Sequence, residues 1–125
     1  MERGTISPTS KEKELIHGMN QKVLIRQKFR DQVFTRDHHL CVICSSISRS
    51  TPATAAHHII DRSRFPDGGY NPDNGASLCH KHHAQAESGL ISCSELRRAA
   101  KIKSIYLPPD FDPKKVYDKW GRIIS

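Results

Sequence analysis

The sequence contains no long hydrophobic run. Its first 20 residues include no apolar segment of the kind that forms the core of a signal peptide, and no stretch approaches the length of a transmembrane helix. Apolar residues make up 36% of the 125 positions, which suffices for one modest core. We therefore expect a single cytoplasmic domain without a membrane partner. In that reducing compartment, the four cysteines are expected to be thiols or metal ligands and not disulfides.

Charge is plentiful and unevenly placed. The formal net charge is +7, from 20 basic and 13 acidic side chains. Residues 41–90 carry four of each sign, whereas residues 1–40 carry eight basic and five acidic side chains and residues 91–125 carry eight and four. A neutral centre between two positive flanks suits a polyanionic partner. Many basic proteins have no such partner, so charge alone leaves nucleic-acid binding open.

The pattern of apolar and turn-forming residues predicts a mixed fold with short elements. Ile25, Phe29 and Val33 repeat at a helical spacing, and the loop letters PDGG and NPDN separate two short apolar stretches. The expected order is a flexible basic arm over 1–20, a helix over 11–36, polar turns over 37–52, a strand over 53–60, a loop over 61–74, a strand over 76–78 and a helix over 79–88.

Two further short helices are expected in the C-terminal part, residues 92–125. Ser92 with Glu95 three positions later forms a capping-box pattern, which predicts a helix. Asp112 as N-cap, Pro113 at the first helical position and Gly121 beyond the end predict a final short helix. The folded domain is thus expected over 21–125, with its core at 41–88.

Cysteine spacing predicts a structural metal site. Cys41 and Cys44 are separated by two residues, and Cys79 and His82 repeat this spacing farther along the chain. Two such pairs are typical of a tetrahedral Zn²⁺ site that is closed to substrate. The alternatives are ordinary buried thiols or a redox pair. Cys93 is left over as a plain cysteine.

A second group of histidines has no place in that zinc site. His83 follows His82 and is rotated by about 100° on a helix, so it faces away from the zinc. Glu87, four residues on, shares the face of His83. On a strand, His57 and His58 point to opposite faces. One can therefore ligate a second metal ion while the other acts as a base.

Together these motifs resemble the HNH endonuclease family, whose fold is called ββα-metal. The resemblance covers just over a third of the chain. The matching segments are Cys41-Val-Ile-Cys44, Ala56-His57-His58-Ile59, the run from Asn74 to Cys79, and His82-His83. It implies an α+β domain with a zinc-stapled ββα-metal core, flanked by an N-terminal helix and two short C-terminal helices. It also implies a cytoplasmic protein of bacterial or phage type.

The resemblance implies a role for each residue at the second site. His58 is expected to be the general base, and His57, where many members have an aspartate, to ligate the catalytic ion with His83. Asn74 is expected to hold the loop and the imidazole of the base through a hydrogen bond. Glu87 stands where the nuclease colicins have a histidine ligand, and here it is either a third ligand or a solvated charge. The ion is expected to be Mg²⁺ or Mn²⁺, with Ni²⁺ and Zn²⁺ as further candidates.

The implied reaction is hydrolysis of DNA, as a nick or a double-strand cut, that leaves 5′-phosphate and 3′-hydroxyl ends. The residues expected to contact nucleic acid are Arg62, Arg64, Arg97, Arg98 and Lys101. Three lysines of the expected last helix, Lys114, Lys115 and Lys119, are assigned to the phosphate backbone in general.

Three alternatives stay open at this point. The first is a zinc module that binds nucleic acid without cleaving it, which leaves His57, His58 and His83 unexplained. The second is a nuclease that acts on RNA or single strands. The third is a subunit that cuts only inside a larger nucleoprotein assembly, such as a phage packaging or mobile-element complex.

Overall fold

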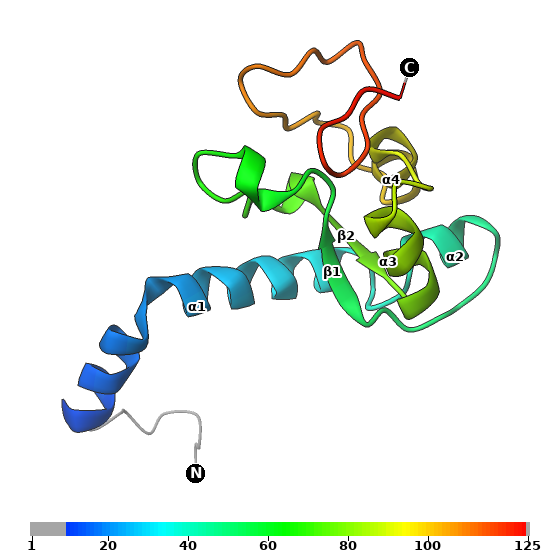
Figure 1. The fold of residues 1–125 in the computed structure, drawn as a ribbon. Helices are drawn as coiled ribbons and strands as arrows, with labels where there is room; N and C mark the ends of the chain where they lie inside the picture. The colour runs from blue at the N-terminus through cyan, green and yellow to red at the C-terminus, as the bar shows by residue number, and fades with distance from the viewer. Residues whose placement is uncertain (1–9, 125) are drawn as a thin grey trace.

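The computed structural model describes the backbone of residues 10–124 and the side chains of residues 21–124. Within this range the chain forms a small α+β structure with a two-stranded sheet (Figure 1). Part of the arm expected over 1–20 lies outside the described residues, and from Ser10 onward its backbone belongs to a helix. The elements are α1 (Ser10–Arg36), α2 (Val42–Ser46), β1 (Ala55–His58), β2 (Gly75–Leu78), α3 (His80–Glu87) and α4 (Cys93–Ala99).

The two strands form an antiparallel pair in which His57 lies opposite Ala76 and His58 opposite Gly75. Both expected strands are confirmed, and the loop between them contains only short 3₁₀ turns among its described residues. β2 is followed almost directly by α3, so β1, β2 and α3 form one strand–strand–helix unit (Figure 1). Ile59, Leu78 and Leu96 are among the fully buried side chains of the core beside this unit.

The expected N-terminal helix is confirmed as α1, and its last turns pack across the sheet. Phe29 and Val33 are buried. Gly75 permits the close approach, because a Cβ atom at this position would lie 2.7 Å from the ring of Phe29 and closer still to Val33. α1 therefore rests directly on the backbone of β2, next to His58.

Polar contacts fix the end of α1 to the same strand. The guanidinium of Arg36 donates hydrogen bonds to the carbonyl oxygens of Pro72 and Gly75 at 2.9 and 2.7 Å. It also pairs with Asp37, whose carboxylate accepts a hydrogen bond from the Ser77 amide at 2.9 Å. Charged hydrogen bonds of this kind to buried backbone groups are stronger than neutral ones.

The sequence predicted one of two short helices and missed the other. The Cys41–Cys44 segment, expected in a turn, forms the short helix α2. The capping box of α4 is confirmed: Ser92 Oγ accepts from the Glu95 amide at 3.1 Å, and Glu95 Oε1 accepts from the Ser92 amide at 3.0 Å.

The expected last helix over 112–120 is wrong. Asp112 does accept a hydrogen bond from the Lys114 amide, but the chain then turns back on itself. Tyr117 and Ile123 form an antiparallel bridge, and Gly121 adopts a φ of +83° in the turn between them. Pairing across this turn and contacts with the body of the protein override the local helix signals.

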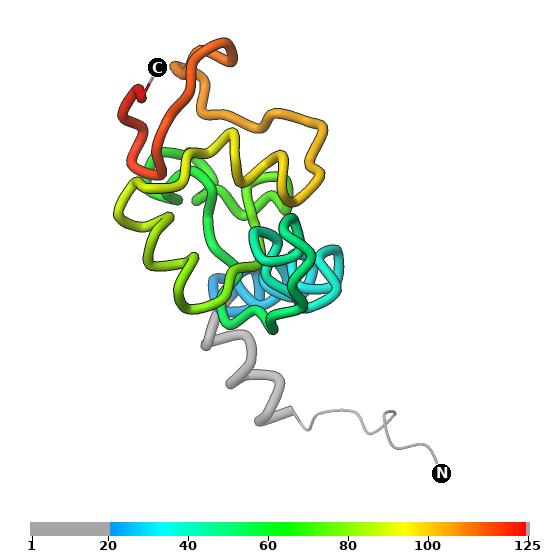
Figure 2. The backbone as a smooth tube through the Cα atoms, turned by 90° about the vertical axis from the view of Figure 1, so that its right-hand side faces the viewer, coloured from blue at the N-terminus to red at the C-terminus, as the bar shows by residue number. Residues whose placement is uncertain are grey.

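The C-terminal segment covers the end of the molecule away from α1, as two perpendicular views agree (Figures 1 and 2). Its contact with the body includes the hydrogen bond from the Asp61 amide to the Lys119 carbonyl, at 2.8 Å. Across residues 10–124, no helix combines the length and the apolar character needed to span a bilayer.

Candidate metal centres and the basic pocket

Three cysteines and one histidine converge between α2 and α3. Cys41 precedes α2 and Cys44 lies within it, while Cys79 precedes α3 and His82 lies in its first turn. The sulfur atoms of these cysteines lie 3.4–3.5 Å from His82 Nδ1, and those of Cys44 and Cys79 lie 3.9 Å apart. The four residues expected to bind zinc are therefore brought together, and they can hold a metal ion.

The dimensions of this cluster suit zinc. With Zn–S bonds of about 2.3 Å and Zn–N bonds of about 2.0 Å, a tetrahedral site has S···N edges of about 3.5 Å and S···S edges of about 3.8 Å. The observed edges agree with both values. Burial raises the pKa of the Cys41 thiol to about 11, so binding of a cation must displace a proton there. Cys93 lies apart, buried, with its thiol against the Ile59 carbonyl at 3.3 Å.

A second cluster lies on the other side of α3. His57 of β1 meets His83 and Glu87 of α3, and their ligand atoms lie within 4.8 Å of one another. Glu87 Oε2 is 3.3 Å from His57 Nδ1 and 3.5 Å from His83 Nε2. A tetrahedral ion with bonds of about 2.1 Å has edges of about 3.4 Å, so these three residues also fit a metal ion. Helix α3 thus presents His82 to one cluster and His83 to the other.

The electrostatics of His57 suit a metal ligand. The residue is 1% exposed, and neither ring nitrogen has a hydrogen-bond partner, although the Glu87 carboxylate is near. Buried polar atoms are normally hydrogen-bonded. Burial and, to a smaller extent, the positive charge of Lys119 lower the pKa of His57 to about 2. The imidazole is therefore neutral and offers an unshared electron pair.

Lys119 of the C-terminal segment also contacts this second cluster, and the sequence did not predict this contact. Its ammonium forms an ion pair with Glu87 Oε2 and lies 3.6 Å from Asp61 Oδ1. The neighbouring Trp120 indole donates a hydrogen bond to the Glu87 carbonyl at 2.9 Å. The expected last helix did not indicate this contact, because it grouped Lys119 with Lys114 and Lys115 as contacts to the phosphate backbone.

His58 points to the opposite face of β1, as the alternation of strand side chains predicted. Its imidazole stacks on the Phe29 ring with centroids 4.4 Å apart, and the Tyr70 ring meets it edge-on at 5.3 Å. Burial lowers the pKa of His58 to about 4, with Lys119 and Arg62 contributing in the same direction. Its Nε2 atom is buried without a hydrogen-bond partner.

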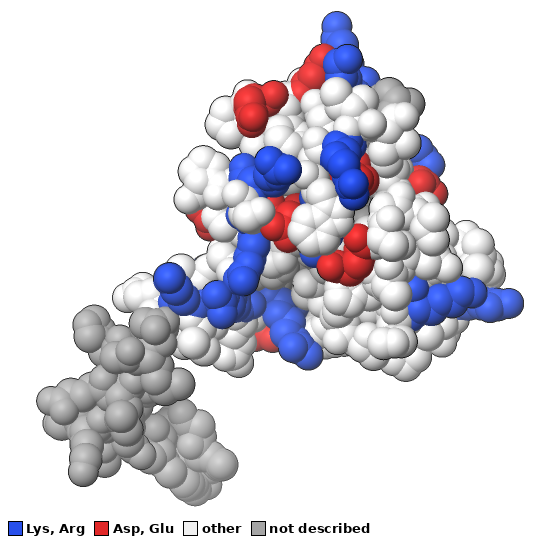
Figure 3. Space-filling view, in the orientation of Figure 1, with Lys and Arg blue, Asp and Glu red and all other residues white. Residues whose placement is uncertain are grey.

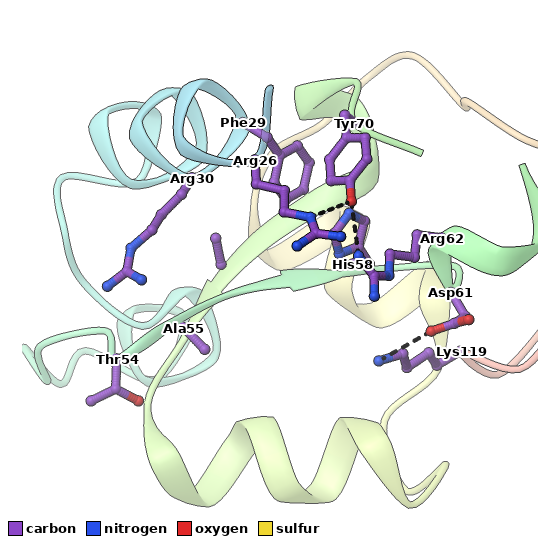
Figure 4. Close-up of a pocket in the computed structure, with 11 residues that line it drawn as sticks. Arg26, Phe29, Arg30, Thr54, Ala55, His58, Asp61, Arg62, Tyr70 and Lys119 are labelled. Carbon is purple, nitrogen blue, oxygen red and sulfur yellow. Dashed lines mark hydrogen bonds and ion pairs between the residues drawn. The ribbon is translucent and has the colours of Figure 1, made fainter. Parts of the chain in front are cut away.

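His58 lines a basic pocket of about 410 Å³ between α1 and the loop that follows β1 (Figure 4). Arg26 and Arg62 converge on the Tyr70 hydroxyl, which accepts hydrogen bonds from them at 3.2 and 3.0 Å. Lys119 and Asp61 close the pocket on the other side (Figure 4). On the surface, lysine and arginine side chains gather over this region and along α1, with acidic groups between them (Figure 3).

Asn74 holds the backbone that follows His58. Its side-chain oxygen accepts from the Ile60 amide, and its side-chain nitrogen donates to the Ile60 and Gly69 carbonyls. These hydrogen bonds join Asn74 to the loop that follows β1. Among its described contacts, no hydrogen bond joins it to the imidazole of His58, which differs from the expected bond to that ring.

Of the arginines and the lysine expected to contact nucleic acid, only Arg62 lines the basic pocket. Arg64 donates to the Trp120 carbonyl at 2.9 Å. Arg98 and Lys101 line a separate hollow next to α2, and Arg97 is partly buried with two nitrogens unpartnered. Arg26 of α1 also lines the basic pocket, which no pattern in the sequence indicated.

Comparison with known proteins adds no relative to this description: no family model, curated protein or solved structure matches the chain.

Proposed function

We propose that the chain is a metal-dependent endonuclease of the HNH type, with a ββα-metal core formed by β1, β2 and α3. One observation carries the proposal. His57 and His58 are adjacent on β1, yet the first joins His83 and Glu87 in a metal-sized cluster and the second lines a cationic pocket. A fold that needed only its zinc staple would not require either arrangement.

The residues of the cluster define what a bound ion would do. A divalent ion on His57, His83 and Glu87 supplies Lewis-acid stabilisation of charge on a phosphate and on the departing 3′ oxygen. His57 is held neutral by burial, as a ligand must be. The three side chains suit Mg²⁺, Mn²⁺, Ni²⁺ or Zn²⁺.

His58 has the position of a general base on the pocket side. In the proposed reaction it takes a proton from the attacking water, and the products carry 5′-phosphate and 3′-hydroxyl ends. Its low pKa follows in part from the cations Lys119 and Arg62. A phosphate in the pocket would neutralise these cations and raise the pKa of His58 toward its ordinary value, which makes it a better base when substrate is bound.

The basic pocket supports a phosphate-bearing substrate. Arg26, Arg62 and Lys119 line it together with the Tyr70 hydroxyl, and guanidinium groups suit the fork geometry of phosphate oxygens. Such contacts position the backbone and do not read bases. We therefore propose DNA as the substrate with weak sequence preference, and RNA or single strands as comparison substrates.

The test is nicking of a supercoiled plasmid by the full chain with Mn²⁺, Mg²⁺, Ni²⁺ or chelator. His58→Ala should abolish nicking, while His80→Ala, an exposed histidine at the start of α3, should not. Zinc content and thermal melting of both variants show whether the fold is intact. Nicking that survives His58→Ala at the wild-type rate would refute the assignment of the base.

A second candidate is a nucleic-acid-binding module without catalysis. The observation that favours it is the Lys119–Glu87 ion pair, which already neutralises the carboxylate of the second cluster. This candidate predicts DNA binding without cleavage under every ion. If the chain alone binds DNA without cleaving it, and a partner protein then restores cleavage, the chain is a subunit of a larger nucleoprotein complex.

A further inference from the structure

Lys119 lies between the second cluster and the basic pocket. Its ammonium is paired with Glu87 on one side and lies 3.6 Å from Asp61 on the other. Glu87 belongs to the cluster with His57 and His83, and Asp61 lines the pocket with His58. The side chain is only 11% exposed, so it is held between the two sites and does not extend into solvent.

The backbone around Lys119 is anchored independently of its side chain. The Lys119 carbonyl accepts from the Asp61 amide at 2.8 Å. On the following residue, the Trp120 amide donates to Asp118 and the Trp120 indole donates to the Glu87 carbonyl, both at 2.9 Å. The ammonium can therefore change partner by rotation about side-chain bonds while the segment stays in place.

A metal ion and the ammonium compete for one oxygen atom. Glu87 Oε2 is the carboxylate oxygen that contacts both His57 Nδ1 and His83 Nε2. The ammonium of Lys119 pairs with this same oxygen. An ion bound at about 2.1 Å from that oxygen would face the ammonium across it. Two cations on one oxygen repel each other, and Lys119 is only 11% exposed, although Glu87 is 35% exposed.

We propose that Lys119 couples ion binding to polyanion binding. Without a divalent ion its ammonium neutralises Glu87. When the ion binds, the ammonium is displaced toward Asp61 and into the basic pocket, where it meets a phosphate oxygen next to His58. This inference rests on the proposed function for the ion site and the phosphate-bearing ligand. It adds a lysine that serves both sites in turn.

The coupling has a thermodynamic consequence. If ion binding delivers a positive charge to the pocket, polyanion binding must strengthen ion binding by the same factor. In the absence of polyanion, Lys119 lowers the affinity of the second cluster for the ion, because the ammonium must first leave Glu87. Removing the ammonium should therefore tighten ion binding and, at the same time, remove part of the benefit that the ion gives to polyanion binding.

The first measurement is a calorimetric titration of the zinc-loaded full chain with Mn²⁺. Lys119→Met keeps the aliphatic stem and removes the charge, and Lys114→Met removes one charge from an exposed position of the same segment. We expect Lys119→Met to bind Mn²⁺ about tenfold more tightly than the wild type, within the usual range of coupling. Lys114→Met and the charge-conserving Lys119→Arg should keep the wild-type affinity.

The second measurement is fluorescence anisotropy with a short DNA duplex, with and without Mn²⁺ at constant ionic strength. It uses the His58→Ala background, in which the proposed function predicts no hydrolysis. Mn²⁺ should increase duplex affinity, and adding Lys119→Met should reduce this increase several-fold. Zinc content and melting temperature confirm that each variant is folded, and Lys119→Gln serves as a second replacement.

The outcomes separate this inference from the proposed function. Equal Mn²⁺ affinity of the wild type and Lys119→Met overturns the role of Lys119 and leaves the ion site standing. Tighter ion binding with an unchanged effect of Mn²⁺ on the duplex overturns the transfer of the ammonium to the pocket. If neither protein binds Mn²⁺ at the second cluster, the ion site of the proposed function fails, and the coupling fails with it.

Discussion

The side-chain amide of Asn74 makes both backbone hydrogen bonds of Ile60, as a neighbouring strand would. Its oxygen accepts from the Ile60 amide at 2.9 Å, and its nitrogen donates to the Ile60 carbonyl at 2.9 Å. The chain thereby keeps strand-like pairing two residues beyond His58, where β1 has already ended. Asn74 itself is fully buried, so water cannot replace these bonds.

Asn74→Ala should destabilise the protein by about 3 kcal/mol, because it leaves both polar groups of Ile60 without their partner in a buried place. Urea unfolding followed by circular dichroism measures this change. The control is Asn71→Ala, which removes only the side-chain acceptor for the Asp73 amide in a short turn and should lose about 1 kcal/mol. Equal losses in the two variants would contradict the special place of Asn74.

Zinc should be bound at one ion per chain by the first cluster. Cys44→Ser should lower the zinc content and the melting temperature together, because ion binding to such a site contributes directly to folding. Cys93→Ala, a buried cysteine outside the cluster, should keep the full zinc content and lose only packing. The measurement is metal analysis of dialysed protein alongside thermal melting. Full zinc content in Cys44→Ser would mean that another set of ligands holds the ion.

The pH dependence of stability should carry the signature of His57. Its folded pKa of about 2 lies far below the value of an unfolded histidine, so the unfolded chain takes up a proton as the pH falls below 6.5 and the folded chain does not. Stability contributed by this neutral imidazole is present above pH 6.5 and is lost as the pH falls. Between pH 6.5 and 5 the loss is about 2 kcal/mol.

His57→Leu should remove that part of the pH slope, since no titrating group remains at the position. The measurement is urea unfolding between pH 7 and 5 without added divalent ion, with the zinc retained. The matched control, His80→Leu, changes an exposed histidine and should keep the wild-type slope. A wild-type slope in His57→Leu would show that other groups dominate the acid sensitivity.

Polyanion binding should depend on the basic pocket more than on α4. Arg26→Ala or Arg62→Ala should weaken binding to a DNA duplex several-fold and reduce the salt dependence by about one phosphate contact. Arg98→Ala removes the same charge from the separate hollow next to α2 and should have a smaller effect. Anisotropy titrations at several salt concentrations measure both quantities. A larger effect from Arg98→Ala would indicate that DNA binds at α4 and not at the basic pocket.

Features set by local spacing could be predicted from the sequence. The spacing within the Cys41–Cys44 and Cys79–His82 pairs predicted the first cluster. Ser92 with Glu95 predicted the capping box. The alternation of His57 and His58 on a strand predicted their opposite directions, because strand geometry leaves no other choice. In each case the signal lies within a few residues and follows one periodicity.

Features set by contacts between distant segments could not be predicted. Asp112, Pro113 and Gly121 carry good helix signals, yet that segment folds back to place Lys119 between Glu87 and Asp61. Arg26 looks like any exposed charge on α1 until Tyr70, 44 positions away, is seen to accept its hydrogen bond. Such pairings have no short-range pattern in the chain, because they depend on where the loops carry the backbone.

His82 and His83 are consecutive in α3 but belong to different clusters. One step along a helix is a rotation of about 100°, so whatever sets the rotation of α3 about its axis aims both side chains at once. The Cys41–Cys44 pair can set that rotation when zinc joins it to His82. We therefore expect a chain that lacks zinc to bind an ion less tightly at the second cluster, because the direction of His83 is then less firmly set.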